Sequence, residues 1–328
     1  MVILSYIVEV QSATLARMLT VLATDFSEEE QARWLALLRD AMPGETLVTE
    51  VGAGRATDVD IAIVANPPSG ALAGLPQLRF VQSLWAGVDR LLADPTLPAA
   101  VPLARMVDPA MNEAMAQTAL WAVLSLHRGF FDYAEQQRAA NWQPHAQRRA
   151  DEVAVAVLGL GQMGRTAASR LAANGYPVTG WGTRDTPVAS LRTCAGDAAL
   201  ASVLAEAEVV VNLLPLTPAT RGLFDARRFA GMRRGAALVN LARGAHVVEA
   251  DLLAALDSGQ IGRAVLDVFE SEPLPASHPF WRHPRVTVLP HAAALTDPRS
   301  AARVVAANVR AVRAGAAPQH LVDRTRGY

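Results

Sequence analysis

The stretch from Val153 to Arg184 constrains the fold of this chain more than any other part of it. It opens with an unbroken apolar run, Val153 to Leu158, which predicts a strand buried on both faces. The sequence Gly159-Leu160-Gly161-Gln162-Met163-Gly164 follows directly. Apolar residues at helical spacing then predict a helix that ends near Gly175, before a second strand at Val178 to Trp181. The stretch therefore predicts a β-α-β unit.

Each glycine of this unit permits something that a bound dinucleotide needs. Gly159 allows a sharp turn out of the strand, Gly161 lets the backbone approach a pyrophosphate, and Gly164 lets the helix lie close to the sheet. The N–H groups and the positive end of the helix would then face the phosphates. The alternative is a tight turn with a purely structural role. We favour dinucleotide binding because the glycines lie between a strand and a helix in a unit of about thirty residues.

Composition narrows the function further. With 328 residues the chain is longer than one hydrophobic core usually organises, so we expect two domains. The formal net charge is -1 and no run of like charge occurs, which argues against a nucleic-acid partner. No apolar stretch reaches transmembrane length, and the single cysteine, Cys194, suits a reducing compartment, so we expect a cytoplasmic protein without a membrane partner. We predict no metal site.

All 30 basic residues are arginine, since the chain contains no lysine. Schiff-base chemistry and lysine acid-base catalysis are therefore excluded. This absence also separates the chain from the 3-hydroxyacid dehydrogenases related to hydroxyisobutyrate dehydrogenase. Those proteins have a similar glycine motif, but they resemble one another in using a catalytic lysine.

The region before Val153 predicts a smaller α/β domain. Residues 1–18 are the least informative, and Met18 is a candidate start. The sequence Gln82 to Asp89 runs from a strand end into a helix start, so it would either hold an anion such as a carboxylate on backbone N–H groups or form an ordinary turn. Short strands are expected at 19–23, 47–51, 60–64, 80–81 and 101–103, with a helix that follows a capping box at Ser27 and Glu30.

A helix predicted at Met111 to His127 is apolar nearly all round, as expected of a helix buried between domains. The segment Arg128 to Arg149 that follows is polar and contains Phe130, Phe131, Tyr133 and Trp142. Because aromatic residues are enriched in interfaces, this segment is either a dimerisation arm or a cover for its own domain.

Four further strands are predicted after the β-α-β unit, at 209–213, 237–241, 263–268 and 286–289. With the first two they make six, the number in a doubly wound dinucleotide fold of order 3-2-1-4-5-6, whose first three strands form the adenosine half. The last three are followed by Arg243, by Asp267 to Glu272, and by His291. Ligands in such a sheet lie beyond the carboxyl ends of the strands, so we expect these side chains to meet beside the nicotinamide.

These residue types suit the reduction of a 2-keto acid. Arg243 offers donors that can bind the substrate carboxylate, and His291 can give the carbonyl oxygen a proton as hydride arrives. Glu272 would favour the protonated imidazole and orient it. Singly, each residue also fits a structural role, as a helix cap, a loop carboxylate or a turn residue. Their position at three successive strand ends favours the catalytic interpretation.

Several long motifs resemble those of the D-isomer-specific 2-hydroxyacid dehydrogenases, and the similarity runs from about Leu19 to Tyr328. More narrowly, the motifs resemble the bacterial glyoxylate/hydroxypyruvate reductase A group. They are residues 240–249 (Asn-Leu-Ala-Arg-Gly-Ala-His-Val-Val-Glu), 266–275 and 283–293, together with Asn141-Trp142-Gln143-Pro144 and the end at 322–328.

The resemblance implies an α/β fold of two domains, in which a doubly wound Rossmann cofactor domain is inserted in a smaller flavodoxin-like substrate domain. The first part of the substrate domain would span 1–105, with 1–18 as an extension, and the cofactor domain 106–290, with a dimerisation arm at about 128–149. Residues 291–328 would return to the substrate domain through a helix at about 298–314. The resemblance also implies a homodimer that closes over its substrate by a hinge.

The resemblance places Arg243, Glu272 and His291 at the family's catalytic positions. The residues that it implies for substrate binding are Trp85, Ala86, Gly87, Val88 and Arg243, the loop acting through its backbone amides. The residues that we expect at the cofactor are Gly159, Gly161, Gln162, Met163, Gly164, Trp181, Thr183, Arg184, Leu214, Pro215, Ala242, Asp267 and Ala293.

NADPH is favoured as cofactor, because Trp181-Gly182-Thr183-Arg184 lacks the carboxylate that would hold the ribose 2′-hydroxyl of NAD. Asp185 weakens this preference, so NADH stays possible. Glyoxylate and hydroxypyruvate are the expected substrates, although Trp85 and Thr118 replace a glycine and a tyrosine of close relatives, which leaves another small 2-keto acid open. An alternative of a different class is a dinucleotide-sensing regulator with the same fold.

Overall fold

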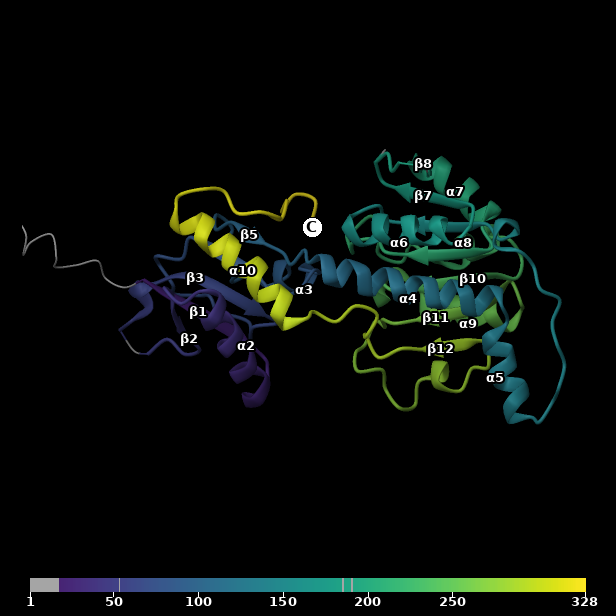
Figure 1. Cartoon of the computed structure of the whole chain (residues 1–328), viewed down its shortest axis with the longest axis horizontal. Helices are drawn as coiled ribbons and strands as arrows, with labels where there is room; N and C mark the ends of the chain where they lie inside the picture. The colour runs from purple at the N-terminus through teal and green to yellow at the C-terminus, as the bar shows by residue number, and fades with distance from the viewer. Residues whose placement is uncertain (1–17, 53, 185, 190) are drawn as a thin grey trace, which may run out of the picture. The chain divides into compact units, whose positions relative to one another are not determined.

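The computed structural model describes residues 18–52, 54–184, 186–189 and 191–328. The chain divides into two compact units, and the second is inserted in the first (Figure 1). The outer unit comprises Met1–Asp108 and Thr296–Tyr328, and the inserted unit comprises Pro109–Leu295. The predicted extension at 1–18 lies, apart from Met18, outside the described residues, as does Asp185.

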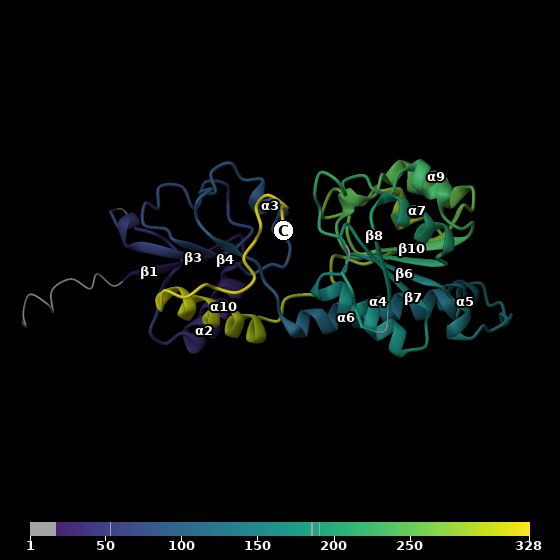
Figure 2. The ribbon, with the colours of Figure 1, turned by 90° about the horizontal axis from the view of Figure 1, so that it is seen from above.

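The inserted unit contains a seven-stranded parallel sheet in the order β12-β11-β10-β9-β6-β7-β8. Its strands are β6 (Val155–Leu158), β7 (Val178–Gly182), β8 (Arg192–Ala195), β9 (Val209–Asn212), β10 (Ala236–Asn240), β11 (Ile261–Leu266) and β12 (Val286–Val288). One face of the sheet is covered by α4 (Pro109–His127) and α6 (Gln162–Ala173) (Figure 2). The other is covered by α7 (Asp197–Glu206), α8 (Ala226–Gly231) and α9 (Glu249–Asp257).

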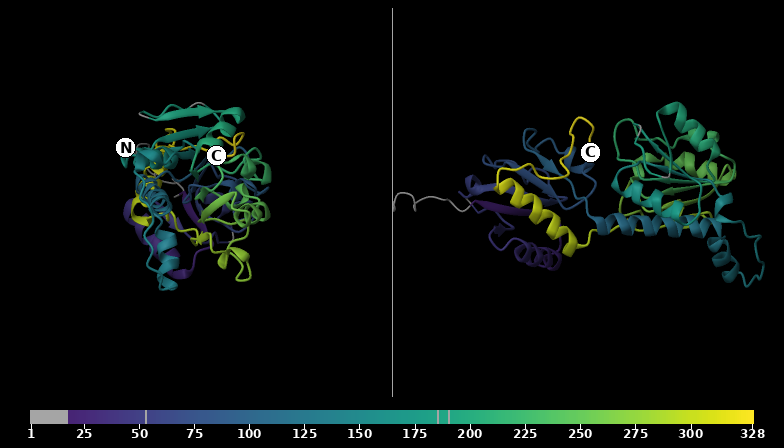
Figure 3. Two further views of the ribbon diagram at one scale, coloured as in Figure 1. Left: turned by 90° about the vertical axis from the view of Figure 1, so that its right-hand side faces the viewer. Right: turned by 45° about the horizontal axis from the view of Figure 1, so that its top comes forward.

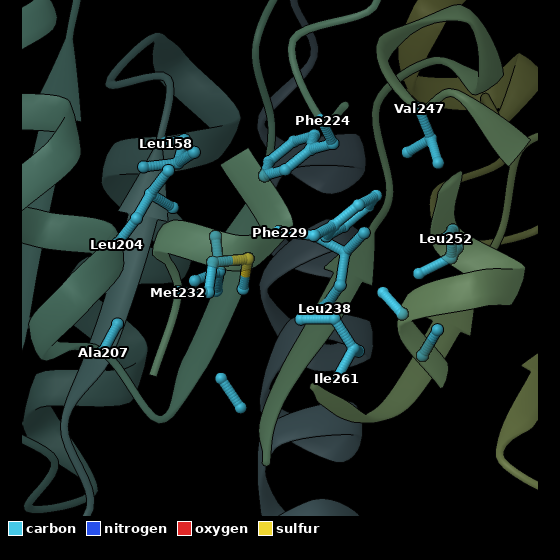
Figure 4. Packing of buried hydrophobic residues seen from close by; sticks show 14 of the residues in the cluster. Leu158, Leu204, Ala207, Phe224, Phe229, Met232, Leu238, Val247, Leu252 and Ile261 are labelled. Atoms are coloured by element: carbon cyan, nitrogen blue, oxygen red, sulfur yellow. The ribbon is translucent and has the colours of Figure 1, made fainter. Parts of the chain in front are cut away.

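The strands of this sheet are apolar throughout because both of their faces are buried. In β6, Ala156 and Leu158 pack in the core under α7, α8 and α9, whereas Val155 and Val157 pack against α4 and α6. Figure 4 shows part of the first core, where Leu158 lies near Leu204. This two-sided core fixes the sheet and hence the loops at its carboxyl edge.

The structure corrects the predicted sheet in one respect. The sequence indicated six strands with the strand near Val209 as the third, whereas β8 is the third and β9 lies fourth, beside β6. The strand β8 was missed because its sequence, Arg-Thr-Cys-Ala, lies at the edge of the sheet and has no apolar run. The strands that precede Arg243, Glu272 and His291 are still neighbours, so the predicted convergence is unaffected.

The outer unit contains a five-stranded parallel sheet in the flavodoxin-like order β2-β1-β3-β4-β5. Its strands are β1 (Leu19–Thr24), β2 (Thr46–Val48), β3 (Val59–Ala65), β4 (Phe80–Ser83) and β5 (Leu103–Ala104). Its helices are α2 (Glu28–Ala41), α3 (Asp89–Leu92) and α10 (Pro298–Arg313). Within this unit β2 is shorter than predicted, and β5 begins only after Pro102, which has no N–H group for a ladder.

The helix α10 returns the chain to the outer unit and lies beside α2 (Figure 3). Its buried face includes Ala301, Val305 and Val309. At its end, Arg313 binds Glu45 at 2.8 Å and also binds Asp60. These contacts fasten the last helix to the first part of the chain.

The segment after α4 forms α5 (Phe130–Arg138) and then runs without regular structure to Arg149. Arg263 of β11 binds Asp132 at 2.8 Å and Glu135 at 2.9 Å, and its guanidinium lies 5.4 Å from the ring centre of Phe131. This part of the segment therefore packs on its own unit. Trp142, in contrast, is 96% exposed. No helix in the described part of the chain is both long and apolar enough to cross a membrane.

Candidate active site

The residues predicted to bind the cofactor all lie in the inserted unit, at or near the carboxyl ends of its strands. Gly159 follows β6, Gly161 caps α6, and Gln162, Met163 and Gly164 begin that helix. The remaining residues lie at β7 (Trp181, Thr183, Arg184) and after β9 (Leu214, Pro215), β10 (Ala242), β11 (Asp267) and β12 (Ala293). Because the strands are parallel, these ends meet at one edge of the sheet.

The geometry of the three glycines fits a dinucleotide. A side chain at Gly159, whose φ is 96°, would lie 2.6 Å from the carbonyl oxygen of Leu213, and one at Gly164 would lie 1.7 Å from that of Gly159. Gly161 differs, because its φ is an ordinary -69° and a Cβ there would meet no atom within 4 Å. The protein itself does not require glycine at this position, but a phosphate approaching the start of α6 would.

Four of the predicted cofactor residues have buried apolar side chains, namely Trp181, Leu214, Ala242 and Ala293. Trp181 and Leu214 are both buried, and the indole of Trp181 donates to the carbonyl oxygen of Gly196 at 3.0 Å. Their side chains support the edge of the sheet from within.

Glu272 and His291 form a hydrogen-bonded pair. Nδ1 of His291 lies 2.8 Å from Oε2 of Glu272, whose Oε1 accepts a bond from the backbone N–H of Phe269 at 2.9 Å. The side chains are 53% and 34% exposed, respectively, so the pair borders the surface of its unit. Both oxygens of the carboxylate are held, which leaves Nε2 of the imidazole to act on a ligand.

The surroundings shift both groups toward their charged forms. The hydrogen bond to Glu272 raises the pKa of His291 above its usual value, against the effects of burial and of the positive charge on Arg243. Burial acts to raise the pKa of Glu272, but the bond from His291, the amide of Phe269 and the charges of His291 and Arg243 together lower it. The charge of Arg243 acts on both members, so the three predicted catalytic residues lie together.

A close approach of two loops places Arg243 beside the pair. A Cβ at Gly244 would lie 1.9 Å from the backbone carbon of Phe269, so only glycine lets the loop after β10 meet the loop that carries Glu272. Nη1 of Arg243 donates to the carbonyl oxygen of Ala242 at 2.7 Å, which directs the guanidinium.

Asp267 anchors the loop of His291. Its Oδ1 accepts from the backbone N–H of Ala292 at 2.7 Å and of Ala293 at 3.1 Å, and its carbonyl oxygen accepts from the N–H of His291 at 2.9 Å. Burial raises the pKa of Asp267, although the bonds from the N–H groups of Ala292 and Ala293 oppose the shift. The backbone of His291 itself has a φ of 54°, an uncommon conformation that the anchored loop maintains.

The predicted carboxylate loop lies in the outer unit, between β4 and α3. Oγ of Ser83 accepts from the N–H of Trp85 at 3.0 Å, and the ring of Trp85 contacts that of Phe26 at 5.9 Å between centres. Among the described residues, the N–H groups of Ala86, Gly87 and Val88 donate no hydrogen bond to the protein. They therefore stay available to an anion.

Some residues that support this edge had no role assigned from the sequence. Asn212, Asn240 and His246 form a buried hydrogen-bonded chain. Glu249 accepts from the N–H of Glu270 at 3.3 Å and binds His278 at 3.1 Å, which holds the loop of Glu272. The signal in the sequence was a polar residue at the end of an otherwise apolar strand, as at Asn212 and Asn240.

Comparisons with known proteins agree with this geometry. A family model described as "D-isomer specific 2-hydroxyacid dehydrogenase, NAD binding domain" matches residues 120–293. The chain is 41% identical over 308 residues to glyoxylate/hydroxypyruvate reductase A of Serratia proteamaculans, covering 92% of this chain and 97% of that protein. It is 38% identical over 304 residues to the Yersinia enterocolitica protein of the same name, covering 91% and 97%.

Two solved structures are similar over nearly the whole chain. A D-isomer specific 2-hydroxyacid dehydrogenase from Xanthobacter autotrophicus, in complex with NADPH and MES, has a TM-score of 0.90 and 40% identity, covering 95% of this chain and 100% of that one. An NADPH-dependent glyoxylate/hydroxypyruvate reductase from Sinorhizobium meliloti, in complex with NADP and sulfate, has a TM-score of 0.89 and 34% identity with the same coverage. The chain therefore belongs to the D-isomer specific 2-hydroxyacid dehydrogenase family.

Proposed function

We propose that this protein is an NADPH-preferring reductase of small 2-keto acids, which converts glyoxylate to glycolate and hydroxypyruvate to D-glycerate. The observation that carries the proposal is the Glu272–His291 pair, with Arg243 beside it, at the carboxyl edge of a nucleotide-binding sheet. The names of the relatives from Serratia and Sinorhizobium support the same activity.

In the proposed mechanism, Arg243 binds the substrate carboxylate through its guanidinium. The loop of Ala86, Gly87 and Val88 in the outer unit offers backbone N–H groups that suit the same kind of anion. Bound NADPH supplies the hydride that reduces the carbonyl carbon. His291 gives its Nε2 proton to the carbonyl oxygen, which forms the 2-hydroxy acid and leaves a neutral imidazole. Glu272 keeps that imidazole oriented through Nδ1 and favours its protonation from solvent before the next turnover.

The preference for NADPH rests on the end of β7. Thr183 and Arg184 follow this strand where an NAD-selective site would carry a carboxylate, and an arginine can pair with the 2′-phosphate of NADPH. The bound cofactors named for the two structural relatives support this assignment. We expect Arg184→Ala to raise KM for NADPH and to leave KM for NADH almost unchanged.

Absorbance at 340 nm tests the function directly. Purified protein is mixed with NADPH and, in turn, glyoxylate, hydroxypyruvate, pyruvate and phenylpyruvate. We expect the highest kcat/KM with one of the first two, and consumption that depends on His291. Activity confined to another small 2-keto acid would correct the substrate, and no consumption with any of them would favour a dinucleotide-sensing regulator.

We also propose that the functional form is a cytoplasmic homodimer, with the outer unit as the substrate domain and the inserted unit as the cofactor domain. An apolar groove of about 510 Å³ on α4 and α5 is lined by Leu120, Trp121, Leu124, Phe130 and Phe131. Trp142, a few residues after α5 in the sequence, has an exposed side chain. Light scattering of the wild type and of Trp142→Ser tests the dimer: we expect two chains per particle and weaker association of the variant.

A further inference from the structure

A chain of three buried polar side chains lies at the carboxyl ends of β9 and β10. It consists of Asn212, Asn240 and His246, each with 0% of its surface exposed. Nδ2 of Asn212 donates to Oδ1 of Asn240 at 2.9 Å and lies 2.9 Å from Nδ1 of His246. Nε2 of His246 lies 3.3 Å from the carbonyl oxygen of Pro215. None of these side chains has a place in the proposed chemistry.

Backbone N–H groups fix which side-chain atoms donate and which accept in this network, because an N–H group can only donate. Oδ1 of Asn212 accepts from the N–H of Leu214 at 3.3 Å, so the other amide atom, Nδ2, must face His246. Since Nδ2 carries only protons, Nδ1 of His246 must accept, and the ring proton lies on Nε2, where it is donated to Pro215. The imidazole is therefore neutral, since a protonated ring would set one N–H group against another.

This hydrogen-bonded network contacts the backbone of two segments of the candidate active site. Oδ1 of Asn240 accepts from the N–H of Ala242 at 3.3 Å, and its Nδ2 donates to the carbonyl oxygen of Arg243 at 2.9 Å. At the other end, His246 holds the carbonyl oxygen of Pro215, in the loop after β9. The N–H group of Ala242 and the carbonyl oxygen of Arg243 are thus bonded to a buried network. Such a network is rigid only when all of its members are paired.

We propose that His246 is a positioning residue: as a neutral Nε2–H imidazole, it fixes the backbone of Arg243 through Asn212 and Asn240. The inference rests on the proposed function of Arg243 in binding the substrate carboxylate. His246 touches neither substrate nor cofactor in this role. It acts by holding the amide of Asn212 in the one orientation that presents Nδ2 to Asn240.

Steady-state kinetics test this role. We expect His246→Ala to lower kcat/KM for glyoxylate about 10- to 100-fold, the range for a lost supporting hydrogen bond or a misplacement of about 1 Å. KM for glyoxylate should rise while the basic limb of the pH profile stays in place, because His291 is untouched. His246→Gln, whose amide offers both an acceptor and a donor, should recover part of the loss.

A matched control and a mutant cycle separate positioning from general stability. His283→Gln replaces a histidine of the same unit before β12, where its ring binds Asp257 at 3.3 Å, and should leave kcat and KM unchanged. Asn212→Ala combined with His246→Ala should be no worse than either variant alone, because both act through one network. Fully additive losses, or a His246→Ala enzyme with normal kinetics and only a lower Tm, would overturn the proposal.

A measurement that needs no activity distinguishes this inference from the proposed function. Long-range ¹⁵N–¹H spectra of the histidine-labelled wild type, which has 7 histidines, report the tautomer of each ring. The resonance assigned by its loss in His246→Gln should show a neutral Nε2–H ring between about pH 6 and pH 8. A charged or Nδ1–H ring contradicts the network even if the enzyme is active. The expected tautomer in an enzyme inactive toward every 2-keto acid supports the network and refutes only the function.

Discussion

The two edges of the seven-stranded sheet use charge in opposite ways. At the carboxyl edge, the hydrogen bond and charge of Glu272 and the charge of Asp267 raise the pKa of His291, whereas the charge of Arg243 acts to lower it. At the amino edge, Arg263 is 13% exposed in its side chain and meets both Asp132 and Glu135. At the carboxyl edge, Arg243 and His291 lie near the half-exposed pair partner Glu272, whereas at the amino edge Arg263 is paired directly with two carboxylates. The difference indicates that the first edge is arranged for an incoming anion and the second for stability.

The largest expected effect comes from His291→Ala. Loss of the general acid should lower kcat/KM for glyoxylate about 10²- to 10⁴-fold, while Tm changes little because the imidazole is half-exposed. His283→Ala is the control, because His283 lies just before the amino end of β12, and this variant should retain activity. Wild-type rates in both variants would show that His291 at the carboxyl edge is not the general acid.

Arg243→Gln should come next. A guanidinium that pairs with the substrate carboxylate is worth about 2–5 kcal/mol when its partner is left unpaired, so kcat/KM should fall about 30- to 5,000-fold, chiefly through KM. Arg285→Gln, near the amino end of β12, is the matched control. A normal KM for glyoxylate in Arg243→Gln would contradict the proposal that Arg243 at the carboxyl edge binds the substrate carboxylate.

Glu272→Gln should have a smaller effect on rate and a clear effect on pH dependence. Because the pKa of His291 is raised above 6.5 mainly by Glu272, activity in the reductive direction should decline as pH rises through that raised value. Without the carboxylate the decline should begin at lower pH, and kcat should fall about tenfold at pH 8. Rate profiles between about pH 5 and pH 9 measure the shift, and an unmoved basic limb would assign the proton to another group.

The same pair makes stability depend on pH. The raised pKa of His291 contributes stability that is complete below its unfolded value, near 6.5, and is lost as pH rises through the folded value. The lowered pKa of Glu272 contributes above its unfolded value, near 4.5, and is lost as pH falls through the folded one. The stability difference between wild type and Glu272→Gln should therefore be largest between those two values. Since both groups are at least a third exposed, we expect less than about 1 kcal/mol, measured by urea unfolding.

The smallest effect on activity should come from Arg263→Met at the amino edge. It removes two ion pairs with half-exposed carboxylates and the contact with Phe131, so the free energy of unfolding should fall by about 1 kcal/mol. The kcat of folded enzyme should stay within about twofold, since the variant lies at the edge opposite the pair. A large loss of kcat without loss of stability would erase the distinction between the edges.

The sequence predicted the parts of this site that depend on order along the chain. The glycine motif lies between a strand and a helix as predicted, and parallel strands bring Arg243, Glu272 and His291 together because the carboxyl ends of such strands share an edge. The strand β8 escaped prediction because an edge strand need not be apolar. Its omission shifted the strand near Val209 to the wrong half of the sheet.

The supporting network could not be predicted from the sequence. Asn212 and His246 are separated by many residues, and their bond depends on the register of β9 against β10 and on a tight turn after Arg243. The neutral state of His246 follows only from the direction of an amide, which no pattern of residue types specifies. The core position of the Trp181 side chain is a similar case, since an apolar residue at a strand end can face either a ligand or the interior.

Because Pro109–Leu295 forms a unit inserted within the outer unit, this middle part of the chain could be exchanged as one segment. Asp108, the last residue before the inserted unit, is hydrogen-bonded to Ser300, shortly after it, and Arg313 of the returning helix pairs with Glu45 and with Asp60 of β3. The two cut points of the outer unit are therefore neighbours in space. A short glycine-serine bridge from Asp108 to Thr296 should let the remainder stand alone, and recombination at the same points could exchange one nucleotide-binding segment for another while keeping the outer fold.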